Sequence, residues 1–287
     1  MPRFSANLGF LWQGMPLLDQ IEAAARAGFR AVEMHWPYDT DPKAVRAACE
    51  RLGLTMLGVN TVKGDVAKGE NGLGALAGRE TEFQAAIDQA IAWQIEAGGK
   101  AIHAMAGIVR PADKPAATAV WVENLSIAAD KAAAHGITLL LEPLSPRAAP
   151  GYFYSTLRGA GEIIARVGKP NVKIMFDVFH VGCAEGDVLT NLKAWWPHIG
   201  HVQIAAVPSR AEPDEGEIDF RAIFHALDAQ GYDGWVGAEY RPRGDTDAGL
   251  AWTKTLGVTL GLPASSAGAN SDCAAQQFCL PPQAVTQ

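Results

Sequence analysis

Short hydrophobic runs alternate along most of the chain with longer stretches that have helical periodicity. The runs are of the length and composition expected for buried parallel strands, which are covered on both faces. We expect eight strands, at Arg3–Leu11, Ala31–Trp36, Thr55–Asn60, Ala101–Ala106, Thr138–Leu144, Val172–Phe179, His201–Val207 and Trp235–Glu239.

The stretches between these runs are rich in Ala, Glu and Leu, and several end in glycine, as at Gly28, Gly53 and Gly136. Glycine just past a helix end adopts the left-handed conformation that closes the helix. We expect helices at Leu17–Ala27, Pro42–Leu52, Thr81–Ala97, Ala116–His135 and Asp219–Gln230.

Eight strand–helix units without a break in composition predict an α/β protein with one domain, a (β/α)8 TIM barrel over residues 1–261. The alternative is a doubly wound open sheet, which often carries a glycine-rich first turn. Here the first turn, Leu11-Trp12-Gln13-Gly14, lacks that fingerprint.

Two segments depart from the repeating pattern. Val62–Arg79 is a long glycine-rich connection after the third strand, and such loops are often lids or binding loops. Residues 262–287 form a low-complexity C-terminal tail rich in Ala, Ser, Gln and Pro. Its composition predicts disorder, and ordered packing against the barrel is the alternative.

Composition narrows the class of protein. The 287 residues carry a net charge of −7, which argues against broad nucleic-acid binding. No apolar stretch reaches the length of about 18 residues that spans a membrane, and the N-terminal residues do not resemble a secretory signal. The four cysteines are scattered without CxxC spacing, so we expect a reduced, cytoplasmic protein. The sequence does not distinguish a monomer from a homo-oligomer.

Four of the expected strands end in oxygen-rich side chains, which are Glu142, Asp177, Gln203 and Glu239. A carboxylate at the end of a buried strand is costly unless something compensates its charge. Because active sites of parallel barrels lie at the carboxyl ends of the strands, we expect these four side chains to meet there.

Three carboxylates and an amide oxygen suit Mg²⁺ or Mn²⁺ better than zinc. A divalent cation would also offset the repulsion among crowded carboxylates. The alternative is that the four are separate rim residues, each satisfied by a helix N-terminus or a salt bridge.

Two further side chains are candidates for substrate binding. His180 follows Asp177 just beyond its strand and would orient or polarise a substrate oxygen, although a lone histidine is more often structural. Arg210 lies in the polar segment after the seventh strand and would clamp a substrate carboxylate, with a solvated surface loop as the alternative. His201 shares a strand face with Gln203 one layer deeper, where we expect core packing. We expect Trp36 either to wall a pocket or to pack on the rim.

Several of these residues fall in motifs that occur in one order along nearly the whole chain. They are Arg3-Phe4-Ser5-Ala6-Asn7-Leu8, Pro37-Tyr38-Asp39, Gly64-Asp65, Gly69-Glu70, Glu142-Pro143, Asp177-x-x-His180, His201-x-Gln203-Ile204-Ala205, Arg210-x-Glu212-Pro213, Gly216-Glu217, Gly234-Trp235 and Glu239-Tyr240. Together they resemble the hydroxypyruvate isomerase family of xylose-isomerase-like barrels.

The resemblance implies interconversion of hydroxypyruvate and 2-hydroxy-3-oxopropanoate (tartronate semialdehyde) through an enediolate. It implies that Glu142 and Glu239 are the acid/base pair, and that Asp177 and Gln203 bind a divalent cation beside them. The substrate would be a small 2-oxo acid, with neither nucleic acid nor membrane as a partner.

Two departures from the family pattern leave the substrate open. The chain has Ala206-Val207-Pro208-Ser209 where some members have Asp-Asn-Pro-His, and Val66 where an aromatic residue is common. Both segments are expected to border the pocket. The alternatives are a four-carbon 2-oxo sugar acid, a ketose 3-epimerase activity, a noncatalytic binding protein or an abasic-site endonuclease. The last needs several histidine ligands, and Gln203 offers an amide instead.

Overall fold

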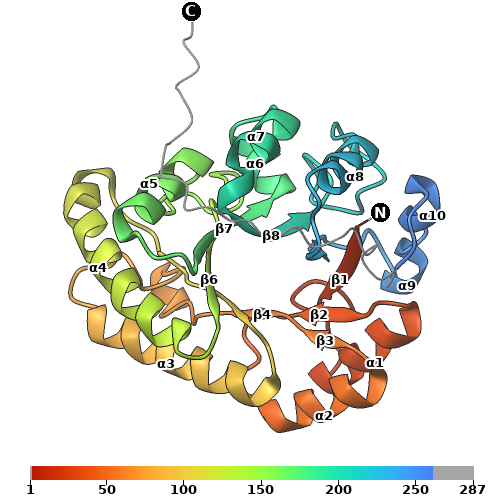
Figure 1. Cartoon of the computed structure of the whole chain (residues 1–287), viewed down its shortest axis with the longest axis horizontal. Coiled ribbons are helices and arrows are strands. Elements are labelled where there is room, and N and C mark those ends of the chain that lie inside the picture. Colours follow the sequence, from red (N-terminus) through yellow and green to blue (C-terminus); the bar gives the residue numbers. More distant parts are fainter. Residues whose placement is uncertain (1, 261–287) are drawn as a thin grey trace, which may run out of the picture.

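The computed structural model describes residues 2–260. Residues 1 and 261–287 lie outside the described part, and so does the tail expected at 262–287. Parallel strands surround a central axis, and helices cover the outside of the strands (Figure 1). The predicted TIM barrel is confirmed.

The sheet has nine strand segments in the order β3-β2-β1-β9-β8-β7-β6-β5-β4, and all neighbours are parallel. The segments are β1 (Arg3–Asn7), β2 (Ala31–Glu33), β3 (Thr55–Met56), β4 (Gly58–Asn60), β5 (Ala101–His103), β6 (Thr138–Leu141), β7 (Val172–Asp177), β8 (Ile199–Ile204) and β9 (Trp235–Ala238).

The expected third strand is present as two segments, β3 and β4, with Leu57 between them. The Leu57 N–H donates to the carbonyl of Val32 (2.9 Å) on one side, and its carbonyl accepts from the N–H of Lys100 (2.9 Å) on the other. Since β3 pairs with β2 and β4 with β5, this position joins the two ends of the sheet.

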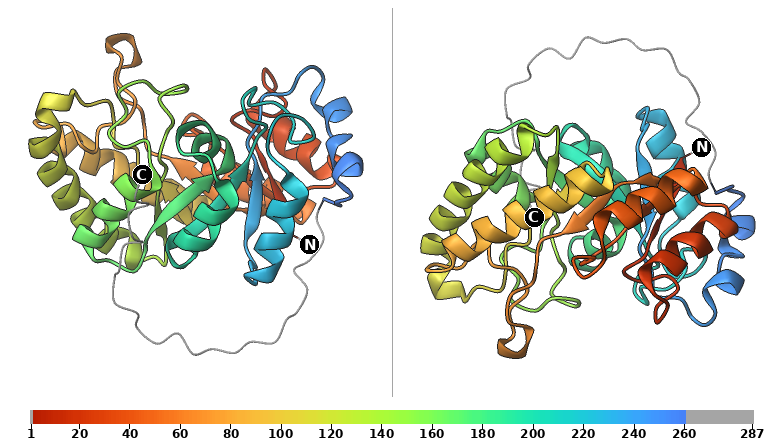
Figure 2. Two further views of the ribbon diagram at one scale, coloured as in Figure 1. Left: turned by 90° about the horizontal axis from the view of Figure 1, so that it is seen from above. Right: turned by 90° about the horizontal axis from the view of Figure 1, so that it is seen from below.

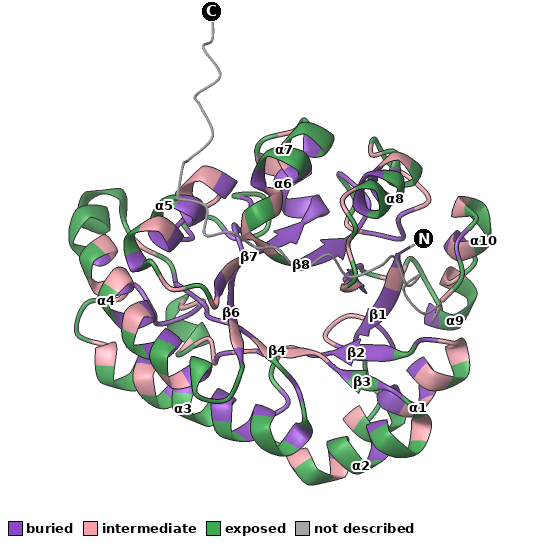
Figure 3. Cartoon of the chain, viewed as in Figure 1, coloured by how far each residue is buried: buried purple, intermediate pink, exposed green. Residues whose placement is uncertain are grey.

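The helices lie outside the strands and present exposed outer faces, whereas most strand residues are buried (Figure 3). They are α1 (Leu17–Ala27), α2 (Pro42–Leu52), α3 (Glu80–Ala97), α4 (Lys114–Ala133), α5 (Leu157–Val167), α6 (Val178–Ala184), α7 (Val188–Trp195), α8 (Phe220–Ala229), α9 (Thr246–Gly249) and α10 (Trp252–Leu256), with 3-10 turns η1 (Val66–Lys68), η2 (Pro111–Asp113) and η3 (Trp196–His198). Within residues 2–260, none of these helices is long and apolar enough to cross a membrane.

The first two helices agree closely with the predictions from the sequence. α1 and α2 have the predicted bounds, and each ends at a glycine with positive φ, Gly28 at 104° and Gly53 at 66°. Side-chain oxygens of Asp41 and Asp219 accept backbone N–H groups at the starts of α2 and α8. These caps satisfy donors that the first turn of a helix leaves unpaired.

All the predicted strands except the third end earlier than predicted, and in two of them the hydrogen bonds show why. After β1, the N–H groups of Phe10 and Leu11 both donate to the carbonyl of Asn7, which turns the chain away from the sheet. β7 ends at Asp177, whose carboxylate accepts the N–H of Phe179 (2.8 Å) and so begins α6. His180 therefore lies on a helix.

The connection of residues 62–79 leaves the barrel after β4 and contains η1 near its tip. Figure 2 shows this segment, in orange-brown, projecting beyond the body of the barrel in both views. The predicted long loop is present, and its base lies beside the mouth of the barrel described next.

Candidate active site

Four neighbouring strands bring the predicted side chains together. Glu142 follows β6, Asp177 ends β7, Gln203 lies in β8 and Glu239 follows β9, and all four are buried. A cavity of about 290 Å³ opens at this end of the barrel, and Glu142 and Glu239 both line it. The prediction that these strand ends lie together is therefore confirmed.

Glu239 is held by three donors. Its Oε2 accepts from Asn7 Nδ2 (2.6 Å) and Gln203 Nε2 (2.5 Å), and its Oε1 accepts from Arg210 Nη2 (2.7 Å). The three hydrogen bonds fix the Glu239 carboxylate in position and offset the cost of burying it.

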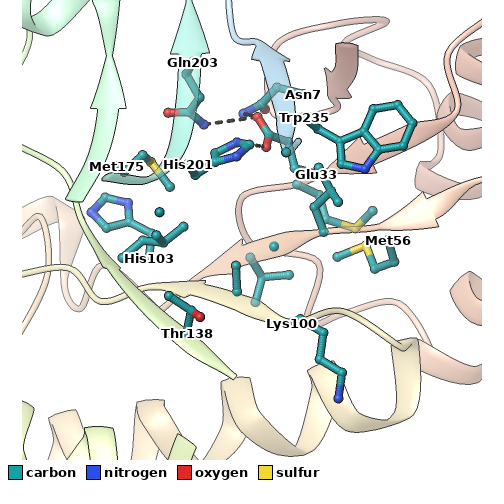
Figure 4. Close-up of a pocket in the computed structure, with 18 of the residues that line it drawn as sticks. Asn7, Glu33, Met56, Lys100, His103, Thr138, Met175, His201, Gln203 and Trp235 are labelled. Atoms are coloured by element: carbon teal, nitrogen blue, oxygen red, sulfur yellow. Dashed lines mark hydrogen bonds and ion pairs between the residues drawn. The ribbon is translucent and has the colours of Figure 1, made fainter. Parts of the chain in front are cut away.

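A second carboxylate, Glu33, lies beneath Glu239 inside the barrel. Its Oε1 accepts from Asn7 Nδ2 (3.2 Å) and Gln203 Nε2 (3.1 Å), and its Oε2 lies 2.6 Å from His201 Nε2. Figure 4 shows the three side chains gathered around the Glu33 carboxylate. The same two amides therefore bridge Glu33 to Glu239.

His201 and Glu33 form a buried ion pair. Burial alone would lower the pKa of His201, but the Glu33 charge and hydrogen bond raise it above its ordinary value. Burial opposes ionisation of Glu33 as well, yet His201, Gln203 and Asn7 hold its pKa below the usual range. The expectation that His201 is simple core packing is wrong, because it neutralises a carboxylate that lies inside the barrel.

The barrel interior has room for this pair. A cavity of about 300 Å³ lies within the strands and is lined by Glu33 and His201 together with mainly apolar side chains such as Met56, Leu140 and Met175 (Figure 4). At Gly237, a Cβ atom would stand 2.2 Å from Glu33 Oε1 and 2.9 Å from Gln203 Cγ. Glycine at this position is what admits the Glu33 carboxylate.

Glu142 differs from Glu239 in its surroundings. Its Oε1 is buried and has no hydrogen-bond partner among the described residues, and the nearest cationic-type groups are His103 Nδ1 (3.4 Å) and His180 Nε2 (3.5 Å). Burial, reinforced by the charges of Glu239 and Asp177, raises its pKa well above the ordinary value. The surroundings of Glu142 therefore favour its protonated form.

The predicted residue His180 is neutral. Burial and the Arg210 charge lower its pKa well below the ordinary value. Its Nδ1 accepts the backbone N–H of Ser145 (3.0 Å), so the ring proton lies on Nε2, which is 3.5 Å from Glu142 and 3.6 Å from Asp177. His180 thus presents an N–H donor to the carboxylates.

Arg210 is the counter-ion of the site. Besides Glu239, its Nη2 lies 3.6 Å from Asp177 Oδ2, and the guanidinium packs 4.8 Å from the ring centroid of Phe10 and 4.9 Å from that of Phe179. Burial raises the pKa of Asp177 to about 7 despite the opposing effect of Arg210. The structure places Arg210 against the protein's own carboxylates.

The donor set fits a hard cation. Buried atoms without a hydrogen-bond partner in residues 2–260 include Glu142 Oε1, Asp177 Oδ2 and Gln203 Oε1. Potential ligand atoms of Glu142, Asp177 and His180 lie within 4.8 Å of one another. Because the Nε2 of His180 carries its proton, the unpaired oxygens are the groups that a cation would satisfy.

Sequence reasoning missed Glu33 and Asn7 as members of the site and gave His103 no role in the isomerase site. Glu33 stands alone as a carboxylate within an otherwise apolar strand, which was the available signal. The expectation that both departing segments border the pocket is confirmed for the long loop, whose Lys63 and Asn71 line the cavity, and is wrong for residues 206–209. Val66 is 61% exposed, and neither Val66 nor residues 206–209 line the cavity. Trp36 does line it.

The fold and site define the class of protein. A family model described as xylose isomerase-like TIM barrel matches residues 21–256, and the chain belongs to this family. A relative named 2-oxo-tetronate isomerase, from Cupriavidus necator, is 45% identical over 88% of this chain and 98% of its own. A putative hydroxypyruvate isomerase from Mus musculus is 42% identical over 91% of this chain and 97% of its own.

One solved structure is also similar in sequence. It is described as AP endonuclease, family 2, from Brucella melitensis, and it is 42% identical with a TM-score of 0.86. The match covers 88% of this chain and 98% of that chain.

We expect His201→Asn to lower the free energy of unfolding by about 3–5 kcal/mol, because it leaves the buried Glu33 charge without its cation. The raised pKa of His201 stabilises the fold below 6.5, and the lowered pKa of Glu33 stabilises it above 4.5. The loss should therefore be largest between these values and smaller at alkaline pH. Urea denaturation across this range measures it.

The matched control is His225→Asn, which changes an exposed histidine of α8. A difference between His201→Asn and the native chain that stays constant from acid to alkaline pH would contradict the ion pair.

Proposed function

We propose that this protein is an isomerase that interconverts hydroxypyruvate and 2-hydroxy-3-oxopropanoate by proton transfer between adjacent carbons. The observation that carries the proposal is the unequal glutamate pair in one cavity, in which Glu239 accepts three hydrogen bonds, one of them from Arg210, whereas burial and neighbouring charges favour the protonated form of Glu142. The names of the 42–45% identical isomerase relatives point to the same chemistry.

Glu239 would act as the base. It removes a proton from C3 of hydroxypyruvate, the C–H electron pair forms a C2–C3 double bond, and the C2 carbonyl oxygen takes up the negative charge. Glu142 then returns a proton to C2, and the hydroxyl proton of C3 moves to the adjacent C2 oxygen. Exchange with solvent restores both glutamates. Positioned acid/base groups of this kind contribute roughly 10²- to 10⁴-fold to rate.

The neutral side chain of His180 is suited to the same proton transfer. His180 offers an Nε2–H that can donate to the oxygen on which charge develops. A neutral donor is useful here because it stabilises an oxyanion without being deprotonated by it. Arg210 would keep Glu239 and Asp177 in place and supply positive charge close to the enediolate.

We further propose that Glu142, Asp177, Gln203 and Glu239 hold a divalent cation, Mg²⁺ or Mn²⁺. The buried oxygens without partners support this assignment. When bound, such an ion would supply Lewis-acid stabilisation of adjacent substrate oxygens. The free cysteines Cys49 and Cys183 and the small 2-oxo acid substrate accord with a cytoplasmic setting.

A four-carbon 2-oxo sugar acid is the second candidate substrate, since the Cupriavidus necator relative is named 2-oxo-tetronate isomerase. The same two glutamates would move a proton from C3 to C2 of that acid. A ketose 3-epimerase activity would use this pair as well. An endonuclease activity, suggested by the name of the Brucella melitensis structure, has less support, because the donors here are mainly oxygens and His180 carries its proton on Nε2.

We expect Glu239→Gln and Glu142→Gln each to lower isomerisation by at least about 10²-fold. The two variants should differ in D₂O. Glu142→Gln should still exchange the C3 protons of hydroxypyruvate, because the base is intact, and Glu239→Gln should not. Proton NMR of the substrate, corrected for exchange without enzyme, measures this.

Glu50→Gln, which changes an exposed glutamate of α2, is the control for these variants. Exchange that survives in Glu239→Gln but not in Glu142→Gln would reverse the two roles. Near-native isomerisation in either variant would remove the acid/base assignment.

We expect the protein to isomerise hydroxypyruvate and to leave abasic DNA intact. Values of kcat/KM for hydroxypyruvate, 2-oxo-tetronate and a neutral ketose, measured with one preparation, rank the candidate substrates. A higher value for 2-oxo-tetronate would move the assignment to the four-carbon acid. Cleavage of abasic DNA would overturn it.

We expect Mg²⁺ or Mn²⁺ to raise the melting temperature of the native chain, because an ion that binds only the folded state stabilises it by about 2.7 kcal/mol at 100 times Kd. Asp177→Asn should lose most of this shift. Asp88→Asn, which changes an exposed carboxylate on α3, should keep it. An equal shift in all three proteins would place the ion elsewhere.

A further inference from the structure

Arg210 is committed to the acid/base machinery, so the substrate carboxylate needs another partner. Its Nη2 lies 2.7 Å from Glu239 and 3.6 Å from Asp177. A substrate carboxylate at this guanidinium would lie against two like charges, and repulsion would oppose its binding. The other cations that line the same cavity are Lys63 and Arg241.

Lys63 has the character of an anion-binding group. It lies at the base of the loop of residues 62–79, and its side chain is half-buried. No carboxylate of residues 2–260 lies within ion-pair distance of its ammonium. Burial lowers its pKa, and no neighbouring acid counters this effect. An anion in the cavity would supply the missing charge partner.

The ammonium is held in place by an aromatic platform. Lys63 Nζ stands 4.0 Å from the centroid of the Trp36 ring. Trp36 is itself fixed, because its Nε1 donates to the carbonyl of Thr61 (3.0 Å) and its ring contacts that of His35. The Lys63 carbonyl accepts the N–H of Gly72 (2.8 Å), which anchors the backbone. A cation on an aromatic face keeps its donors free for a ligand.

The remaining groups at this end of the cavity are suited to the same ligand. Asn71, from the same loop, also lines the cavity and carries an amide that can donate. Arg241 is exposed, and its backbone N–H is tied to the Arg210 carbonyl (2.7 Å). Arg241 therefore stands at the rim, whereas Lys63 lies further inside.

We propose that Lys63, held on the ring of Trp36, binds the carboxylate of the substrate and selects 2-oxo acids over neutral ketoses. The inference deepens the proposed isomerase function and rests on it. With the carboxylate at Lys63, the carbonyl and hydroxyl carbons extend toward Glu142 and Glu239, which line the same cavity. Arg210 is left to serve the glutamates.

The test is Lys63→Gln, with Lys63→Arg as the charge-conserving variant. The control is Lys68→Gln, which changes an exposed lysine of the same loop that pairs with Asp65. A charge-assisted hydrogen bond corresponds to roughly a 10- to 100-fold difference in binding. We expect Lys63→Gln to raise KM for hydroxypyruvate by about that factor, with kcat changed much less. Lys63→Arg should recover most of the loss, and Lys68→Gln should behave as native.

Two binding probes separate this subsite from the reaction. Calorimetry should show weaker binding of D-glycerate, a carboxylate that cannot isomerise, to Lys63→Gln, and unchanged binding of neutral dihydroxyacetone. Equal loss for both ligands, or native D-glycerate binding and KM in Lys63→Gln, would overturn the subsite. If the native chain binds D-glycerate through Lys63 but does not isomerise hydroxypyruvate, the proposed function fails and the subsite stands.

Discussion

The burial of four carboxylates at one end of a barrel is the constraint on which the rest of the site depends. Glu33, Glu142, Asp177 and Glu239 are each at most 5% exposed, and none can remain charged without compensation. His201 pairs with Glu33 and Arg210 pairs with Glu239, while burial and neighbouring charges raise the pKa of Glu142. The different compensation given to each carboxylate makes them chemically unequal.

That inequality arises from the way the barrel layers its side chains. Asn7 and Gln203, from β1 and β8, each donate to Glu33 below and to Glu239 above, so the deeper ion pair fixes the geometry of the glutamate at the mouth. Glu142, on the opposite side of Asp177, has two histidines at ion-pair distance within residues 2–260, and burial lowers the pKa of both. The two glutamates thereby acquire unequal surroundings, which suits a division into acid and base.

The sequence predicted the fold and the four strand-end residues because both depend on local patterns. Buried runs, glycine caps and a polar residue at the end of a strand can be read without knowing which strands are neighbours. The Glu33–His201 pair could not be predicted in this way, since β2 and β8 are far apart in the chain and their side chains meet only inside the closed barrel. The same applies to Arg210, whose reach to Glu239 depends on the path of the loop after β8. The boundary at Asp177 was missed because a capping aspartate and a strand-end aspartate look alike in sequence.

The absence of a Cβ atom at Gly237 limits the substitutions that this part of the barrel can accept. Position 237 and position 33 compete for one volume, so a larger residue at 237 is compatible only with a shorter residue at 33. Loss of the Glu33 carboxylate would in turn leave His201 without its counter-ion and would leave the amides of Asn7 and Gln203 with only Glu239 as their shared acceptor. Divergence in this part of the barrel must therefore proceed through several substitutions together, which makes the floor of the site slower to change than the loops that surround its mouth.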